Sequence, residues 1–288
     1  MHYLLATLVF WISKIAGAAL PDADSNLVRC GTQAPPAALL DMAMSMANST
    51  SKAAVLEADR ALEINLYFHL VLSAGKEGTV TGQMLEDQLD VLNIDFSPHG
   101  ISFKLIDTLY HYNDDWATGA YDLEMMTAVR RGTYADLNVY YLSDFYETSS
   151  GWLGMCNFPE STSAGNSIII EDGCVLDSGT LPGGALAPYN EGATSTHEVG
   201  HWFGLLHVFE GLSCSGGGDF VSDTPQQSVA TDGCPSSQDS CLDLEGLDNF
   251  HNYMDYSLDK CADTFTEGQK TRMYQMWDEY RAAYQEES

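Results

Sequence analysis

The amino-acid sequence predicts an α/β protein whose last third is mostly irregular. In the first two thirds, stretches with the apolar alternation of strands are separated by stretches with helical spacing. Strands that alternate with helices along a chain are typical of an α/β layer. After His207 the sequence changes to Gly, Ser, Asp and Cys, which indicates loops held by disulfides, and an amphipathic helix is expected at 267–284.

Composition and charge limit the possible functions. The 288 residues allow one large domain or two small ones, and 45% hydrophobic residues are enough for a packed core. The 41 acidic and 12 basic residues give a formal net charge of −29, which would repel nucleic acid and anionic lipid. We therefore expect no nucleic-acid or membrane partner. The acidity serves solubility, although dense carboxylates also suit calcium.

Residues 1–18 have the pattern of a secretory signal peptide. Residues 3–12 are apolar but too few to span a bilayer, and Ala16, Gly17 and Ala18 supply the small residues of a cleavage site. The positive charge that usually precedes the apolar run is nearly missing, so a buried N-terminal helix is the alternative. No later stretch is long and apolar enough to be an anchor. We expect a secreted, extracellular protein.

Residues 19–60 are expected to form a short pro-segment, ahead of a larger domain at 61–288. Helical spacing occurs at 39–46 and 53–62. Asn48 begins the N-glycosylation sequon Asn-Ser-Thr, which places it on an exposed turn. In the larger domain the patterns predict strands at 64–74, 101–110, 137–142 and 167–171, with helices at 82–92 and 123–131.

The most informative stretch runs from His197 to His207 and reads H-E-V-G-H-W-F-G-L-L-H. On a helix, His197 and His201 lie on one face and can direct two imidazoles at one zinc ion. Gly204 can take a positive φ that ends the helix and brings His207 back as a third ligand. Three protein ligands leave a position for water, as in a catalytic zinc site, and Glu198 is placed to take that water's proton.

Two later stretches extend this pattern, namely G-D-F-V-S-D-T-P at 218–225 and N-Y-M-D-Y at 252–256. Together with the histidine motif they resemble the pappalysin family of metzincin zinc metalloproteases, including its secreted fungal members, from about residue 64 to the last helix. The resemblance implies a twisted mixed sheet with two long helices in an upper subdomain, 61–207. An irregular, disulfide-stapled lower subdomain, 208–288, would follow and end in a helix.

The family resemblance also implies roles around the cleft. Met254 should lie beneath the zinc as an apolar base, and Tyr256 can donate a hydrogen bond to the oxyanion of the tetrahedral intermediate. The strand expected at 167–171 corresponds to the edge strand that lines the substrate cleft in metzincins. Because a sheet edge has unpaired N–H and C=O groups, we expect a protein or peptide substrate to bind there as an added strand.

An acidic loop after the histidine motif carries Asp219, Asp223 and Thr224. It resembles the calcium-binding loop of some pappalysins, and calcium prefers several oxygen ligands of this kind. The alternative is a solvated acidic turn. His69, His99, His111 and His251 have no partner at metal-ligand spacing, so we expect them to be ordinary packed or surface residues.

The seven cysteines are an odd number, which leaves at least one thiol unpaired in an oxidising compartment. The family resemblance suggests the pairs Cys214–Cys241 and Cys234–Cys261, and Cys156–Cys174 is then left by elimination. Cys30 remains. It stands in an Arg-Cys-Gly tripeptide that resembles the cysteine switch of matrix metalloproteases and of some pappalysins, in which a thiolate fills the open zinc position. The alternatives are a different disulfide or a free thiol.

These expectations describe a secreted, monomeric zinc endopeptidase that is made as a latent zymogen. It would hydrolyse internal peptide bonds through a zinc-bound water, with Glu198 as the general base. One alternative is a secreted zinc-binding effector without catalysis, but such a site needs no general base. The other alternative is a zinc amidase of small molecules, which a series of substrates of increasing peptide length would distinguish.

Overall fold

The computed structural model describes residues 28–48, 60–120, 122–149 and 151–285 of the chain. The signal peptide expected at 1–18 lies outside these residues, as do most of the helix expected at 53–62 and the side chain of Asn48. Leu62, at the end of that expected helix, instead begins a strand. Among the described helices, none combines the length and the apolar character that crossing a bilayer requires.

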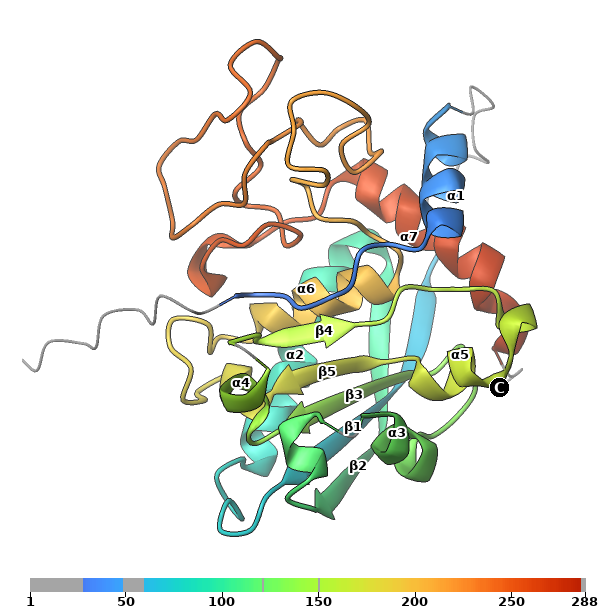
Figure 1. The fold of residues 1–288 in the computed structure, drawn as a ribbon, viewed down its shortest axis with the longest axis vertical. Helices are drawn as coiled ribbons and strands as arrows, with labels where there is room; N and C mark the ends of the chain where they lie inside the picture. Colours follow the sequence, from blue (N-terminus) through green and yellow to red (C-terminus); the bar gives the residue numbers. More distant parts are fainter. Residues whose placement is uncertain (1–27, 49–59, 121, 150, 286–288) are drawn as a thin grey trace, which may run out of the picture.

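A five-stranded sheet forms the centre of the molecule, in the order β2-β1-β3-β5-β4 (Figure 1). Its strands are β1 (Leu62–Leu72), β2 (Ile101–Tyr112), β3 (Leu137–Leu142), β4 (Gly154–Cys156) and β5 (Cys174–Asp177). All neighbours are parallel except β4, which runs antiparallel to β5 at one edge. Every residue of β3 is buried, as expected for a parallel strand that is covered on both faces. The predicted mixed α/β sheet is confirmed.

Helices cover both faces of the sheet. On one face, α2 (Gly82–Phe96) and α6 (Ala193–Trp202) pack against alternate residues of β1, and α3 (Asp122–Val129) packs on the other face. The remaining helices are α1 (Ala37–Asn48), α4 (Phe145–Thr148), α5 (Asn166–Glu171) and α7 (Glu267–Tyr280). Short 3₁₀ helices lie at Ser97–His99, Trp116–Thr118, Thr162–Ala164, Ser178–Thr180, Asp259–Cys261 and Ala282–Tyr284.

The prediction of a strand at 167–171 is wrong, because these residues lie in α5. The run of three isoleucines has strand propensity, but each of them is only half-buried and none pairs with the sheet. The edge strand is β4, whose three residues are too few to show an alternating pattern. Its register is fixed where Cys156 pairs with Cys174, since these two residues are also joined by a disulfide.

The loops that follow α6 are held by disulfides and buried carboxylates. Residues 203–258, all of them described, form no regular helix or strand. The disulfides Cys214–Cys241 and Cys234–Cys261 tie these loops, and together with Cys156–Cys174 they are the three pairings expected from the sequence. The buried carboxylate of Asp255 accepts hydrogen bonds from the backbone and hydroxyl of Thr231 and from Gln227. Polar contacts therefore organise loops that lack a large apolar core.

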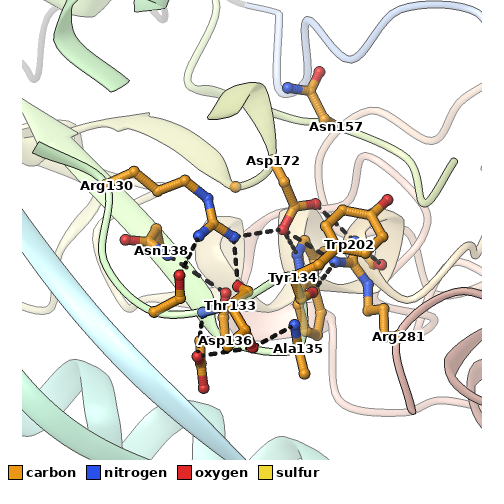
Figure 2. Close-up of polar contacts among 12 residues, drawn as sticks. Arg130, Thr133, Tyr134, Ala135, Asp136, Asn138, Asn157, Asp172, Trp202 and Arg281 are labelled. Atoms are coloured by element: carbon orange, nitrogen blue, oxygen red, sulfur yellow. Dashed lines mark hydrogen bonds and ion pairs between the residues drawn. The ribbon is translucent and has the colours of Figure 1, made fainter. Parts of the chain in front are cut away.

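A buried ion-pair network joins the end of α7 to the end of α6 (Figure 2). The carboxylate of Asp172 accepts two hydrogen bonds from Arg281, at 2.8 and 3.0 Å, and one from the indole of Trp202, at 3.0 Å. Arg130 lies 3.5 Å from the same carboxylate. The Arg281 guanidinium also lies 3.7 Å from the centre of the Trp202 ring and donates to the Trp202 carbonyl. These contacts fix the C-terminal end of α6, one residue beyond His201.

Candidate metal centre

Helix α6 carries two of the three histidines, and a turn supplies the third. His197 and His201 lie one turn apart on the buried helix, with their ring centres 4.9 Å apart. Gly204 takes a φ of 82°, and its N–H donates to the His201 carbonyl at 2.8 Å. A side chain there would be strained at this φ and would also collide with Met276. The turn brings Nε2 of His207 within 3.1 Å of Nε2 of His201.

A thiol completes the cluster. The ligand-type atoms of Cys30, His197, His201 and His207 all lie within 4.8 Å of one another. The Cys30 sulfur is 3.5 Å from Nε2 of His201 and belongs to no disulfide. Three imidazoles and one thiol are a donor set that zinc commonly takes.

Backbone carbonyls orient two of the imidazoles. Nδ1 of His197 lies 2.7 Å from the Tyr253 carbonyl, and Nδ1 of His201 lies 2.8 Å from the Leu205 carbonyl. Because a carbonyl can only accept, each Nδ1 carries the hydrogen and each Nε2 directs its lone pair at the cluster. Nε2 of His197 is buried and has no hydrogen-bond partner. A buried lone pair without a donor fits a site for a cation.

Burial keeps all three imidazoles neutral. It lowers the pKa of His201 to about 4 and holds the pKa values of His197 and His207 well below their ordinary range. Neighbouring imidazoles lower the pKa values of His197 and His207 further. Neutral imidazole is the form that coordinates a metal ion. The residues present therefore fit a zinc ion.

Met254 lies directly beneath α6, and Gly200 makes this approach possible. Met254 is fully buried, and a Cβ atom added to Gly200 would overlap its sulfur. The turn that carries Met254 also presents the Tyr253 carbonyl to His197. Asn252 holds this turn, since its side-chain oxygen accepts from the Met254 N–H at 2.9 Å. The histidine motif therefore needs glycine at position 200 because Met254 packs against it, a reason that the motif itself does not reveal.

A carboxylate from α2 links the two elements that position His197. Asp95 accepts a hydrogen bond from the Thr196 hydroxyl at 2.6 Å and another from the Tyr253 hydroxyl at 2.8 Å. Thr196 directly precedes His197 in α6, and the Tyr253 carbonyl orients the His197 ring. Burial raises the pKa of Asp95, while the two hydroxyl donors oppose that shift. No sequence pattern marks this residue, because its partners lie far along the chain.

Glu198 lies between the histidines, Cys30 and the edge strand. One of its carboxylate oxygens accepts from the Thr32 hydroxyl at 2.9 Å and lies 3.5 Å from the Cys30 sulfur, while the other has no partner. A Cβ atom at Gly154 of β4 would come within 2.9 Å of the Glu198 side chain, so this glycine provides the space. Burial raises the pKa of Glu198 to about 8.

Residues 28–32 lie along the edge strand and reach the histidines. The Gly31 N–H donates to the Gly154 carbonyl at 2.8 Å, and the Val28 N–H donates to the Gly151 carbonyl at 2.9 Å (Figure 1). The Thr32 hydroxyl accepts from the Cys156 N–H at 2.9 Å. The chain's own segment therefore occupies the free edge of β4.

Arg29 and Tyr256 anchor this segment on the other side of the cleft. The Arg29 guanidinium is buried, lies 3.1 Å from the Asp259 carboxylate and donates to the Ser257 carbonyl. The Tyr256 hydroxyl donates to the Cys30 carbonyl at 3.3 Å, and its ring lies beside those of His197 and His207. Burial and the Glu198 carboxylate raise the pKa of the Cys30 thiol.

The acidic loop lies apart from the histidine cluster. One oxygen of Asp219 accepts from the Thr224 hydroxyl at 2.7 Å and from the Val221 N–H at 3.0 Å, while the other is buried without a partner. Burial raises the pKa of Asp219 to about 7. Both oxygens of Asp223 accept hydrogen bonds at the start of α7, from Thr266 and Gly268. One free carboxylate oxygen remains in this loop.

The structure describes four further histidines, and none of them joins a metal-type cluster. His69 and His111 contact each other at 3.3 Å, and burial lowers the pKa of His69 to about 3. His99 is buried against Phe265, and His251 is exposed. Sequence reasoning missed Thr32, Asp95 and Gly154.

The chain is similar in sequence to known metalloproteases. The model of the Peptidase M43 family, described as pregnancy-associated plasma protein-A, matches residues 127–278. An extracellular metalloprotease of Neurospora crassa is 44% identical over 281 residues, which covers 95% of this chain and 97% of that protein. An extracellular metalloprotease of Sordaria macrospora is 46% identical over 258 residues, covering 88% of this chain and 89% of that protein.

Solved structures show the same fold. Mature mirolysin from Tannerella forsythia, in complex with a cleaved peptide, superimposes with a TM-score of 0.61 at 27% sequence identity, covering 76% of this chain and 92% of that chain. Promirolysin gives a TM-score of 0.65 at 23% identity, covering 87% of this chain and 94% of that chain.

Replacement of Asp95 by Asn should weaken zinc binding about 10- to 100-fold, since partners that orient metal-binding histidines contribute on this scale. The amide nitrogen cannot accept from one of the two hydroxyls, so the Tyr253 carbonyl would shift away from His197. Competition with a chromogenic chelator measures the affinity. Asp90→Asn, at an exposed position of the same helix, is the matched control. An unchanged zinc affinity in Asp95→Asn would show that the carboxylate does not position the site.

Proposed function

The chain belongs to the Peptidase M43, or pappalysin, family of metzincin metalloproteases, and we propose that it is a secreted zinc endopeptidase made as a latent zymogen. The observation that carries this proposal is the convergence of three neutral imidazoles beside Glu198, with Cys30 among them. The sequence relatives are extracellular metalloproteases by name, which supports the extracellular location. Residues 61–288 would form the catalytic domain.

His197, His201 and His207 would hold the zinc ion, and Cys30 would be the fourth ligand in the unprocessed chain. Bound zinc would supply a Lewis acid and lower the pKa of a water molecule in the cleft. The carbonyl partners of His197 and His201 would keep both rings in place when the thiol leaves.

Glu198 is the residue we assign as the general base. It would accept a proton from the attacking water and pass it to the leaving amine. Both groups that contact its Oε2 belong to residues 30–32, so removal of that segment leaves the carboxylate facing the cleft. Tyr256 already donates to a backbone carbonyl at the site, and the same hydroxyl would stabilise the oxyanion formed from a substrate carbonyl.

A protein substrate would bind as a strand added to β4. The support is that residues 28–32 already use the backbone groups of this edge. Mirolysin, a structural relative, has been solved with a cleaved peptide. Gly154 leaves room for Glu198 beside the added strand.

Latency would follow from the contacts of residues 28–32. The thiol of Cys30 lies where water must enter, Thr32 contacts the general base, and Arg29 forms a buried ion pair with Asp259. An ion pair of this kind is costly to break on one side only, because a buried charge is left alone. The segment therefore has three separate anchors, which cleavage within 19–60 would remove together, whereas loss of the thiol alone would open the metal position.

In the processed enzyme, replacement of Glu198 by Gln should lower the hydrolysis of an unfolded protein about 10²- to 10⁴-fold, the usual contribution of a general base. The zinc content should stay the same, because the three imidazoles are intact. Glu191→Gln, at an exposed position, is the control. If the processed wild-type chain holds zinc and cuts no internal peptide bond, the endopeptidase assignment is wrong and a zinc-binding effector becomes the better account.

In the unprocessed chain, replacement of Cys30 by Ala should produce activity without cleavage, at least about ten-fold above the wild-type chain, since a thiolate is a strong zinc ligand. Mass spectrometry of the same samples shows that the segment is intact. Ser45→Ala, at an exposed position of α1, serves as the control. Equal latency in Cys30→Ala and wild type would remove Cys30 from the mechanism.

Calcium binding by Asp219 and Thr224 is a second proposal for this chain, supported by the unpartnered buried oxygen of Asp219. Calcium needs six to eight oxygen ligands, so backbone carbonyls and water would have to supply most of them. We expect added calcium to raise the melting temperature of the wild-type chain but not that of Asp219→Asn. Differential scanning calorimetry measures both melting temperatures. The site is eliminated if calcium changes the melting temperatures of the two chains by the same amount.

A further inference from the structure

Helix α1 covers an apolar surface that lies next to the metal centre. We call this surface the α1 seat. It is formed by Phe158, Leu206, Met276, Phe220 and Tyr280, with Arg272 beneath. Two residues of α1, Leu39 and Ala43, stand four positions apart and are 1% and 0% exposed on this surface. A single helical face thus contacts the seat.

Arg272 gives the seat a polar part. Arg272 is buried, with a relative exposure of 3%. One of its nitrogens donates to the Ala43 carbonyl at 3.3 Å and to the Phe220 carbonyl at 2.8 Å, while Nε and Nη1 have no hydrogen-bond partner. Arg272 therefore contacts the α1 backbone through one nitrogen, and the nearby carboxylate of Asp219 interacts with its charge.

The seat is continuous with the cleft. The Phe158 ring lies 5.2 Å from the His201 ring, and Leu206 directly precedes His207. Residues 31–36 connect the edge of β4 to the start of α1 (Figure 1). A pocket of about 420 Å³ lies between α1 and residues 217–222, and Phe220 is the seat residue that lines it.

We propose that the α1 seat binds protein substrates once residues 19–60 have been removed. Its occupant would be a substrate segment that carries apolar side chains about nine residues from the cleaved bond, the separation of Cys30 from Leu39. Removal of α1 would expose a contiguous apolar patch beside the metal centre, and such patches mark binding surfaces. The inference rests on the proposed function, since it requires a processed, active enzyme.

The test compares three synthetic peptides with the same residues around the cleaved bond. The first is short, the second has an extension with Leu and Ala four positions apart, and the third has Ser at both of those positions. Each extended peptide is made with the extension at either end. For one end, we expect kcat/KM of the apolar peptide to exceed that of the Ser peptide about ten-fold through a lower KM, since burial of one leucine is sufficient for this.

Variants then locate the effect. In Phe220→Ser the ratio of the two kcat/KM values should fall toward one, whereas Ile94→Ser, at an exposed position of α2, should keep it. Because both peptides are measured on the same enzyme, partial unfolding of a variant does not change the ratio. The inference is overturned if the short peptide is cleaved and the apolar and Ser peptides have equal kcat/KM whichever end carries the extension. The endopeptidase assignment stands in that case. If the short peptide is not cleaved by the processed, zinc-loaded chain, both fail together.

Discussion

The structure depends on holding three neutral imidazoles, two of them buried and the third half-buried, with their ligand atoms close together. Two carbonyls, from Tyr253 and Leu205, hold Nδ1 of His197 and His201. Burial keeps the pKa values of these rings below physiological pH, so the lone pairs stay available. A group of buried lone pairs is unfavourable unless a cation or a donor satisfies it. The surrounding elements can be understood as the means by which this arrangement is kept.

Those elements come from distant parts of the chain. Asp95 ties α6 to the turn beneath it, and Asp172 with Arg281 ties the end of α6 to α7. Gly200 and Gly154 remove side-chain volume where Met254 and Glu198 approach. Buried carboxylates, a packed methionine and two glycines thus hold the site in place, as a larger apolar core holds other parts of the fold.

Much of this architecture could be predicted from the sequence, because its signals are local. The spacing of His197 and His201, with Gly204 behind them, predicts a helix and a turn, and the strand predicted at 137–142 matches β3 to the residue. The edge strand could not be predicted, since β4 has three residues and depends on its pairing with β5. Asp95 and Thr32 carry no local pattern, because their roles depend on partners far away in the sequence.

The central claim is that Cys30 and the three histidines form one metal site, which X-ray absorption spectroscopy of the zinc-loaded protein tests most directly. In the unprocessed chain we expect a first shell of three nitrogen donors and one sulfur donor, with a zinc–sulfur distance of about 2.3 Å. After processing, the sulfur should be replaced by oxygen while the three nitrogens remain. A first shell without sulfur in the unprocessed chain would contradict the account, as would the loss of nitrogen donors on processing.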